Sequence, residues 1–245
     1  MRLIRLLSLL ALLLLAAAPL RAQDPTPAEV DQIQKIVRDY LRDHPEVIIS
    51  ALKQYQDKQA AEQAAKAREA IASHKDELFK DPTSPVGANP DGDVVLVEFF
   101  DYRCPYCKAV APDLQKAVAK DGKVRFVYKE FPILGPVSIV AARAALAAQQ
   151  QDKYVPFHDK LMAFKGNLDE AAIYAMASEV GLDVAKLKAE MEKPAIKDAI
   201  DRNYKLADKL NIQGTPAFVI GGELLPGAAS FDELTAAIKR ARTGG

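Results

Sequence analysis

The feature that most constrains the fold is the position of Cys104 and Cys107, the only two cysteines in the chain. They directly follow an apolar run over residues 94–100 that one charge, Glu98, interrupts. Such a run is typical of a strand that is buried on both faces. Pro105 favours a helix start here, because its fixed backbone angle is helical and its missing amide needs no partner in a first turn. The sequence therefore predicts a buried strand that leads directly into a helix, with both cysteines at the start of that helix.

The elements after this strand and helix predict an α/β domain over residues 93–245. A second apolar run completes a strand–helix–strand unit, and an alanine-rich stretch after it is almost entirely helical in composition. Ser230 and Glu233 form the pattern of a capping box, which predicts the start of a last helix. The later elements are, in order, a strand over 124–128, a helical insertion over about 136–210, a hairpin over 217–225 and a helix over 231–241.

Residues 1–22 have the layout of a secretory signal peptide. Arg2 and Arg5 precede an apolar run over 6–18, and Ala22 provides a cleavage position. An uncleaved anchor is the alternative, but the apolar run is shorter than the roughly 20 residues that a membrane span needs. We therefore expect export to the periplasm, where cysteines can be held oxidised.

The charge of the whole chain is balanced, with 33 basic and 33 acidic residues. Removal of the signal peptide takes three arginines away and leaves a mild acidic excess. Nothing in this balance argues for a nucleic-acid partner or for a strongly charged membrane-binding surface.

Residues 23–80 predict a separate helical segment, because helix-forming residues dominate and glycine is absent. His44-Pro45 predicts a break between two helices. We expect the segment to form a homo-oligomer, with docking on the main domain as the alternative. Residues 81–92, with three prolines and two glycines, predict a linker. Apolar residues at spacings of three and four gather on one face of the first helix: Val30, Ile33, Ile36, Val37, Tyr40 and Leu41.

The spacing of the cysteines predicts a redox-active pair that can form the disulfide Cys104–Cys107. The unpaired amides at the helix start favour a thiolate at Cys104, which would attack, while Cys107 would resolve the mixed disulfide. A structural disulfide and half of a zinc site are the alternatives. Zinc usually takes four ligands, and the three histidines are widely scattered. We therefore expect neither a metal nor a cofactor.

Glu98 is a third candidate for a catalytic role. It lies on an otherwise apolar strand, six residues before Cys104, where burial raises the pKa of a carboxyl group. Such a group could accept the proton of Cys107, directly or through water. The alternative is an ion pair with a basic residue such as Lys129 on the neighbouring strand.

Two segments resemble the DsbA-like disulfide oxidoreductases: VEFFDYRCPYC over 97–107 and Gly214-Thr215-Pro216, within a similarity that spans roughly residues 90–243. The resemblance implies a thioredoxin fold with an inserted helical domain, Cys104 as the nucleophile and Cys107 as the resolving thiol. It also implies a cis peptide before Pro216 that faces the cysteines. The residues that would contact substrate are then Thr215, Pro216, Pro105 and Tyr106.

The helical segment is similar to the leading domain of the copper-sensitivity suppressor proteins called ScsC. The similarity lies in IVRDYLRDHPEV over residues 36–47. Some members of that family use the segment to oligomerise, which agrees with the expectation from the apolar face.

Two departures from the DsbA oxidase pattern bear on the direction of electron flow. Tyr106 stands where that oxidase has histidine, and Thr215 stands where it has valine. Without the histidine, the pKa of Cys104 should be less depressed and the disulfide less oxidising. We therefore expect an isomerase or reductase of exported proteins, kept reduced by a membrane partner like DsbD or ScsB. A DsbA-type oxidase served by a quinone-linked membrane partner, and a copper-binding or holdase protein, are the alternatives.

Overall fold

A computed structural model of the chain describes residues 24–244 and divides into two compact units, with the boundary between Lys58 and Gln59. The expected signal peptide, residues 1–22, lies outside the described residues. Among the described residues, no helix combines the length and the apolar character of a membrane span.

The first unit consists of α2 and the first part of α3, and most of its large apolar side chains are exposed. α2 spans Pro27–Asp43 and begins at Thr26, whose hydroxyl and Glu29 form a capping box. α3 spans Pro45–Ser73, so the break predicted at His44-Pro45 is confirmed. No side chain of α2 is buried. The exposed apolar residues of these helices are Ile33, Ile36, Val37, Tyr40, Val47, Ile48, Ile49, Leu52 and Tyr55.

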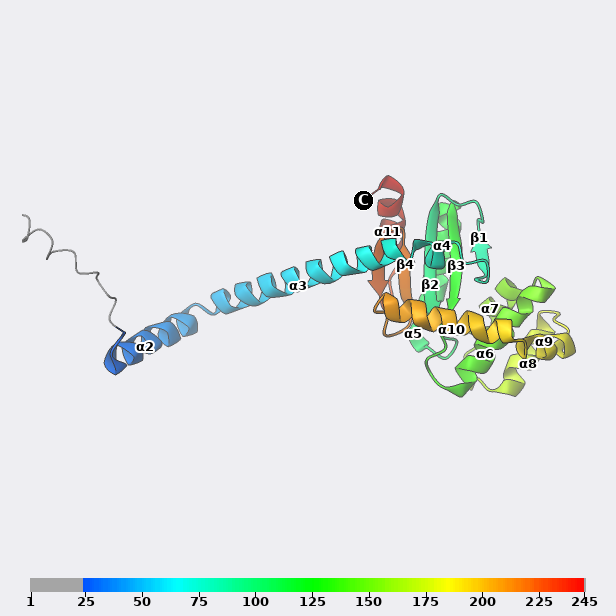
Figure 1. The fold of residues 1–245 in the computed structure, drawn as a ribbon, viewed down its shortest axis with the longest axis horizontal. Helices are drawn as coiled ribbons and strands as arrows, with labels where there is room; N and C mark the ends of the chain where they lie inside the picture. The colour runs from blue at the N-terminus through cyan, green and yellow to red at the C-terminus, as the bar shows by residue number, and fades with distance from the viewer. Residues whose placement is uncertain (1–23, 245) are drawn as a thin grey trace, which may run out of the picture. The chain divides into compact units, whose positions relative to one another are not determined.

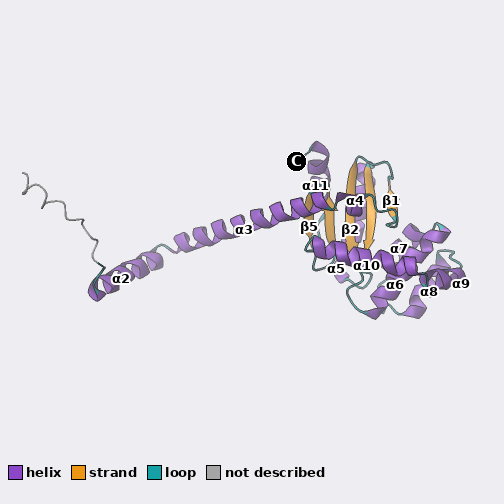
Figure 2. Ribbon diagram, in the orientation of Figure 1, coloured by secondary structure: helices purple, strands orange, loops and turns teal. Residues whose placement is uncertain are grey.

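A mixed sheet forms the centre of the second unit (Figure 2). It has five strands in the order β1-β3-β2-β4-β5. β2 and β3 are parallel neighbours, and the other pairs are antiparallel. β2 is therefore flanked on both sides, as its continuous apolar sequence predicted. The strands are β1 Val86–Ala88, β2 Val94–Phe100, β3 Val124–Glu130, β4 Ala217–Ile220 and β5 Glu223–Pro226.

Helices connect and cover this sheet as the sequence predicted (Figure 1). α5 joins β2 to β3, a block of helices lies between β3 and β4, and α11 ends the described chain. The capping box at Ser230 and Glu233 is present at the start of α11. The helices are α4 Lys75–Phe79, α5 Pro105–Asp121, α6 Pro136–Ala147, the 3-10 helix η1 Ala148–Gln151, α7 Tyr154–Ala163, α8 Glu170–Glu179, α9 Val184–Met191, α10 Pro194–Lys209 and α11 Phe231–Thr243.

Side-chain alternation along the strands divides the core into two layers. Leu96 and Phe100 of β2 belong to the cluster that includes the buried side chains of α5 and α11. Val97 and Phe99 belong to a second cluster on the opposite face, with residues of α4 and α10. By the same alternation, Glu98 faces the α5 side, and Lys129, which is paired in register with Phe99, faces the other.

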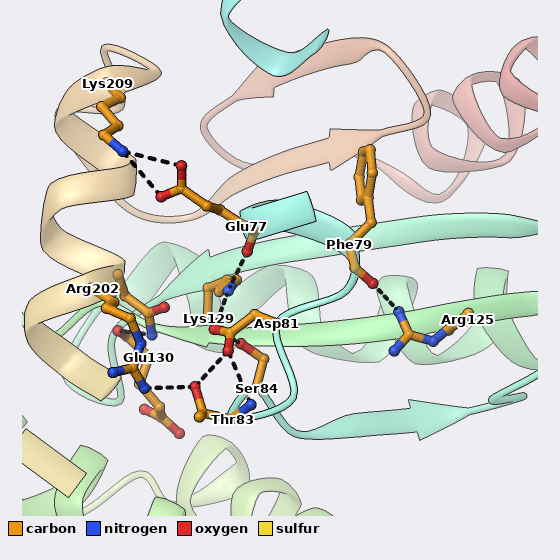
Figure 3. A network of polar contacts seen from close by, with 11 residues as sticks. Glu77, Phe79, Asp81, Thr83, Ser84, Arg125, Lys129, Glu130, Arg202 and Lys209 are labelled. Atoms are coloured by element: carbon orange, nitrogen blue, oxygen red, sulfur yellow. Dashed lines mark hydrogen bonds and ion pairs between the residues drawn. The ribbon is translucent and has the colours of Figure 1, made fainter. Parts of the chain in front are cut away.

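The second face is held by a polar network around Lys129 (Figure 3). The Lys129 side chain is 1% exposed and its Nζ lies 2.9 Å from Asp81 Oδ2, which makes a buried ion pair. The same Nζ donates to the Glu77 carbonyl oxygen at 2.9 Å, and Arg125 donates to the Phe79 carbonyl oxygen at 2.6 Å. The segment expected as a linker thus contributes Asp81 and β1 to the second unit.

Replacement of Asp81 by asparagine should destabilise the second unit, because it leaves the Lys129 ammonium buried without a counter-charge. We expect a loss of about 3 kcal/mol in the free energy of unfolding at neutral pH, measured by urea denaturation. Burial acts to raise the pKa of Asp81, but hydrogen bonds from Thr83 and the Lys129 ammonium together outweigh it and lower the pKa. Its contribution is therefore present above the unfolded pKa of about 4 and lost as the pH falls below it.

Asp76→Asn is the matched control, because the Asp76 side chain is 82% exposed and, among residues 24–244, forms an ion pair only with Lys80 at the surface. That change should alter the stability by less than about 0.5 kcal/mol. Equal losses for the Asp81 and Asp76 variants would show that the buried ion pair does not anchor this segment.

Candidate active site

The two cysteines lie at the start of α5, shortly after the end of β2. Cys104 is the N-cap residue and Pro105 occupies the first turn. The Cys107 amide donates to Cys104 Sγ at 3.4 Å. The helix start thus directs an unpaired amide and the positive end of its dipole toward Cys104 Sγ, as the sequence predicted.

These surroundings lower the pKa of Cys104 to about 5. The largest cause is a hydrogen bond from the Cys107 side chain. Burial acts in the opposite direction and raises the pKa. The Thr215 side chain and the backbone amides of Cys107 and Tyr106 lower it further. Cys104 is therefore a thiolate at neutral pH, which is the nucleophilic form of cysteine.

The loop before β4 supplies the other wall of the site. The Thr215-Pro216 peptide is cis. Cys104 Sγ lies 3.2 Å from the Thr215 carbonyl oxygen, to which its thiol form donates. Tyr106 extends from the site and is 66% exposed. The structure thus brings Thr215 and Pro216 to Cys104 across 111 residues of sequence.

Cys107 is fully buried, and its pKa is shifted in the opposite direction to that of Cys104. Burial, followed by the hydrogen bond to Cys104 and the charge that Glu98 carries when ionised, raises the pKa of Cys107 far above its usual range. No disulfide joins Cys104 and Cys107 in this structure. The disulfide Cys104–Cys107 stays a prediction.

Glu98 is buried on the same face of the sheet as the cysteines, with 2% of its surface exposed. Within residues 24–244 its carboxyl group has neither a hydrogen bond nor an ion pair, while its backbone is paired in the sheet. Burial, followed by the charge of Cys104, raises the pKa of Glu98 to about 8. The alternative of an ion pair with Lys129 is wrong, because Lys129 lies on the opposite face and pairs with Asp81.

Asp101 is a residue of the site that the sequence interpretation missed. It is 1% exposed and lies between the end of β2 and Cys104. Its carboxylate accepts hydrogen bonds from the Arg103 amide at 2.7 Å, the Ser138 hydroxyl at 2.8 Å and the Leu134 amide at 2.9 Å. Asp101 therefore fixes the loop that carries Cys104 against the start of the helical insertion. The one signal in the sequence was an acidic residue directly after the apolar strand.

A second missed cluster lies where β3 meets the helical insertion. The hydroxyls of Tyr102 and Tyr154 both donate to Glu130 Oε1 at 2.8 Å, and the Tyr102 oxygen lies 3.1 Å from His158 Nδ1. All four residues are buried. Nothing in the sequence pattern indicated that His158 would lie beside Tyr102. Over residues 24–244, no three His, Cys, Asp or Glu side chains are grouped as a metal site.

Two family models match the chain, one for each unit. A model described as the DSBA-like thioredoxin domain matches residues 95–239. A model described as the copper resistance protein ScsC N-terminal domain matches residues 29–62.

Solved structures and curated proteins agree with these matches. A thioredoxin-like oxidoreductase from Silicibacter pomeroyi DSS-3 is 47% identical and has a TM-score of 0.68, with 70% of this chain and 99% of that chain covered. Proteus mirabilis ScsC in a transitional conformation is 34% identical, with a TM-score of 0.68, 90% of this chain and 100% of that chain covered. Disulfide bond formation protein D of Bacillus subtilis is 26% identical over 172 residues, which are 65% of this chain and 78% of that protein.

Some curated relatives are much longer than this chain. The Na(+)/H(+) antiporter NhaA 1 of Salinispora arenicola is 29% identical over 153 residues, which are 62% of this chain. The chain covers only 24% of that protein, so it spans about a quarter of the length of these relatives. Together, the matches confirm the predicted thioredoxin-type fold with a helical N-terminal segment.

Thr215→Val should raise the pKa of Cys104, because it removes the side-chain hydroxyl that helps stabilise the thiolate. The measurement is the far-ultraviolet absorbance of the thiolate in the reduced protein as a function of pH. We expect the midpoint to move upward from about 5. Thr215→Ser retains a hydroxyl and should titrate like the wild type. A valine variant with an unchanged midpoint would show that the Thr215 hydroxyl does not stabilise the thiolate.

Proposed function

This chain belongs to the family of DsbA-like thioredoxin domains, which are thiol-disulfide oxidoreductases, and we propose that it isomerises or reduces disulfides in exported proteins. The observation that carries the proposal is the position of Cys104 Sγ. It lies at the helix start, 3.2 Å from the backbone beside the cis peptide, with its pKa lowered to about 5. A client chain bound along this backbone would present its disulfide to a thiolate.

The reaction begins when the Cys104 thiolate attacks one sulfur of a client disulfide. This forms a mixed disulfide and releases the other client sulfur as a thiolate. In isomerisation, a second client thiol displaces Cys104, and the client is neither oxidised nor reduced overall. In reduction, the deprotonated Cys107 attacks Cys104 Sγ, the client sulfur leaves as a thiolate, and the enzyme keeps the disulfide. A membrane electron donor would then reduce that disulfide.

Glu98 is proposed to accept the proton of Cys107 in the reductive step. Burial, followed by the charge of the Cys104 thiolate, raises the pKa of Glu98 to about 8, so Glu98 is mostly protonated at neutral pH in the resting reduced enzyme. Once Cys104 enters a mixed disulfide, that negative charge disappears and the pKa of Glu98 falls. Glu98 therefore becomes a better proton acceptor at the step in which Cys107 must ionise.

Tyr106, which stands where the DsbA oxidase has histidine, favours isomerisation or reduction over oxidation. Stabilisation of the thiolate stabilises the reduced enzyme, so a lower cysteine pKa goes with a stronger oxidant. The pKa of Cys104, about 5, lies above the value of about 3.5 for DsbA. A DsbA-type oxidase remains the second candidate, because a pKa of about 5 is still well below that of an ordinary cysteine.

The exposed apolar face of the first unit supports self-association. Ile33, Ile36 and Tyr40 recur at helical spacing on α2 and are 55%, 59% and 52% exposed. A stripe of this kind needs an apolar partner, and the same stripe on further copies of the chain would provide one. An oligomer would bring several Cys104 sites to one client, which suits the rearrangement of wrong disulfides.

Ile36→Glu should convert the protein to monomers and reduce its isomerase activity, because it places a charge within the apolar stripe. Lys35→Glu is the matched control, since Lys35 lies on the opposite side of α2 and its side chain is 77% exposed. Mass by light scattering and reactivation of a scrambled-disulfide substrate in glutathione buffer are the measurements. A wild type that oxidises a reduced substrate but never reactivates a scrambled one would establish the oxidase instead.

Glu98→Gln should slow the attack of Cys107 on a mixed disulfide by about 100-fold, because glutamine cannot accept the proton. The attack of Cys104 on an external disulfide should change much less. Reduced protein mixed with excess Ellman's reagent separates these steps, because each releases one coloured thiolate in turn. If the second release keeps its wild-type rate, Glu98 has no role in proton transfer.

A further inference from the structure

Arg103 directly precedes Cys104, and its side chain is exposed. Apart from the cysteines, residues 101–108 contain two other groups that carry a charge. Asp101 is buried, and its carboxylate is occupied by three hydrogen bonds. Lys108 is half-buried, and its ammonium donates at 2.7 and 2.8 Å to backbone carbonyl oxygens at the end of α7. Arg103 is therefore the charged side chain of this stretch that a client chain can meet.

A closed set of hydrogen bonds holds the Arg103 side chain in place. The Arg103 amide donates to Asp101 Oδ1 at 2.7 Å, and the Leu134 amide donates to Asp101 Oδ2 at 2.9 Å. Arg103 Nη1 in turn donates to the Leu134 carbonyl oxygen at 2.5 Å. Gly135 has a φ of 109°, which favours glycine, and a Cβ at this position would lie only 3.2 Å from Arg103 Nη1. The loop between β3 and α6 is thus shaped around the guanidinium.

The guanidinium keeps most of its hydrogen-bonding capacity for another group. Arginine has five N–H donors in a planar fork. Among residues 24–244, the Arg103 side chain donates only to Leu134, and no carboxylate pairs with it. By contrast, Arg143 of α6 pairs with Glu192 at 2.9 Å. A fixed, exposed guanidinium without a counter-ion is suited to bind a carboxylate, because the fork matches its geometry and little side-chain freedom remains to be lost.

We propose that Arg103 recognises a carboxylate of the client chain near the cysteine that Cys104 attacks, which makes Arg103 a specificity-determining residue. This inference rests on the disulfide chemistry proposed above. An extended chain advances about 3.3–3.6 Å per residue, so an acidic residue within about three positions of the client cysteine can reach a side chain that neighbours Cys104. Clients with lysine at such a position should react more slowly, because two positive charges then approach one another.

Short peptides that carry one cysteine as a mixed disulfide with 2-thiopyridine test this preference on the whole reduced protein. The Cys104 thiolate attacks the peptide sulfur, and the bond to the leaving group breaks. The leaving group departs as pyridine-2-thiolate, which takes up a proton and is followed by its absorbance. Glutamate, glutamine or lysine occupies, in turn, each position up to three residues before or after the peptide cysteine. All peptides share the leaving group, so the ratio of their rates reports the effect of the peptide charge.

At low salt and at the position that reaches Arg103, we expect the glutamate peptide to react about threefold faster than the glutamine peptide. The lysine peptide should react about threefold more slowly than the glutamine peptide. These ratios should approach one in about 1 M salt, which screens exposed charges. Arg103→Gln should bring them close to one at low salt, and Arg103→Glu should invert the order. A role of Arg103 in the loop or in the thiolate alone would change the rates of all three peptides equally.

Arg68→Glu is the matched control. It makes the same change of charge on α3, where Arg68 and Val94, at the start of β2, line the same surface cavity. Cys104 follows the other end of β2, so this variant should keep the wild-type ratios.

The outcomes distinguish this inference from the proposed function. Equal rates for the three peptides at every position, or wild-type ratios that persist in Arg103→Gln, would overturn the inference and leave the disulfide chemistry intact. Failure of Cys104 to react with any of the peptides would contradict the proposed function itself.

Discussion

The negative charge on Cys104 Sγ is the constraint on which the rest of the active site depends. The start of α5 and the side chains of Cys107 and Thr215 stabilise this charge, which lowers the pKa of Cys104 to about 5. Burial, followed by the same charge, raises the pKa of Glu98 to about 8. In the proposed reaction, loss of the thiolate in a mixed disulfide removes the second of these causes at the step in which Cys107 needs a base. The buried strand β2 places all these groups in one core.

The two faces of the sheet carry different polar groups. The face toward α5 carries Glu98 and the cluster of Tyr102, Glu130 and His158. The opposite face carries Lys129, whose ion pair with Asp81 fixes the chain before β1 to the sheet. Because alternate residues of a strand point to opposite faces, Glu98 and Lys129 can lie on adjacent strands without neutralising one another. Glu98 keeps a raised pKa for this reason.

Local sequence patterns predicted much of the fold. The features that these patterns did not predict depend on contacts between residues far apart in the sequence. The apolar run before Cys104, Pro105 and the capping box at Ser230 each specify a structure within a few residues, and all three were confirmed. The partner of Lys129 could not be predicted, because Asp81 lies 48 residues earlier in a stretch rich in proline and glycine. Likewise, only the folded helical insertion brings His158 to Tyr102, across 56 residues. Thr215 was located in advance through a family resemblance and not through its own sequence context.

The equilibrium between the Cys104–Cys107 pair and glutathione tests the central claim most directly, because it measures how strongly the thiolate stabilises the reduced enzyme. The account predicts a reduction potential between about −120 mV, the value of DsbA, and about −270 mV, the value of thioredoxin. A potential at or above that of DsbA would contradict it and make the protein an oxidase. Failure of the two cysteines to form a disulfide at any glutathione ratio would contradict the disulfide chemistry itself.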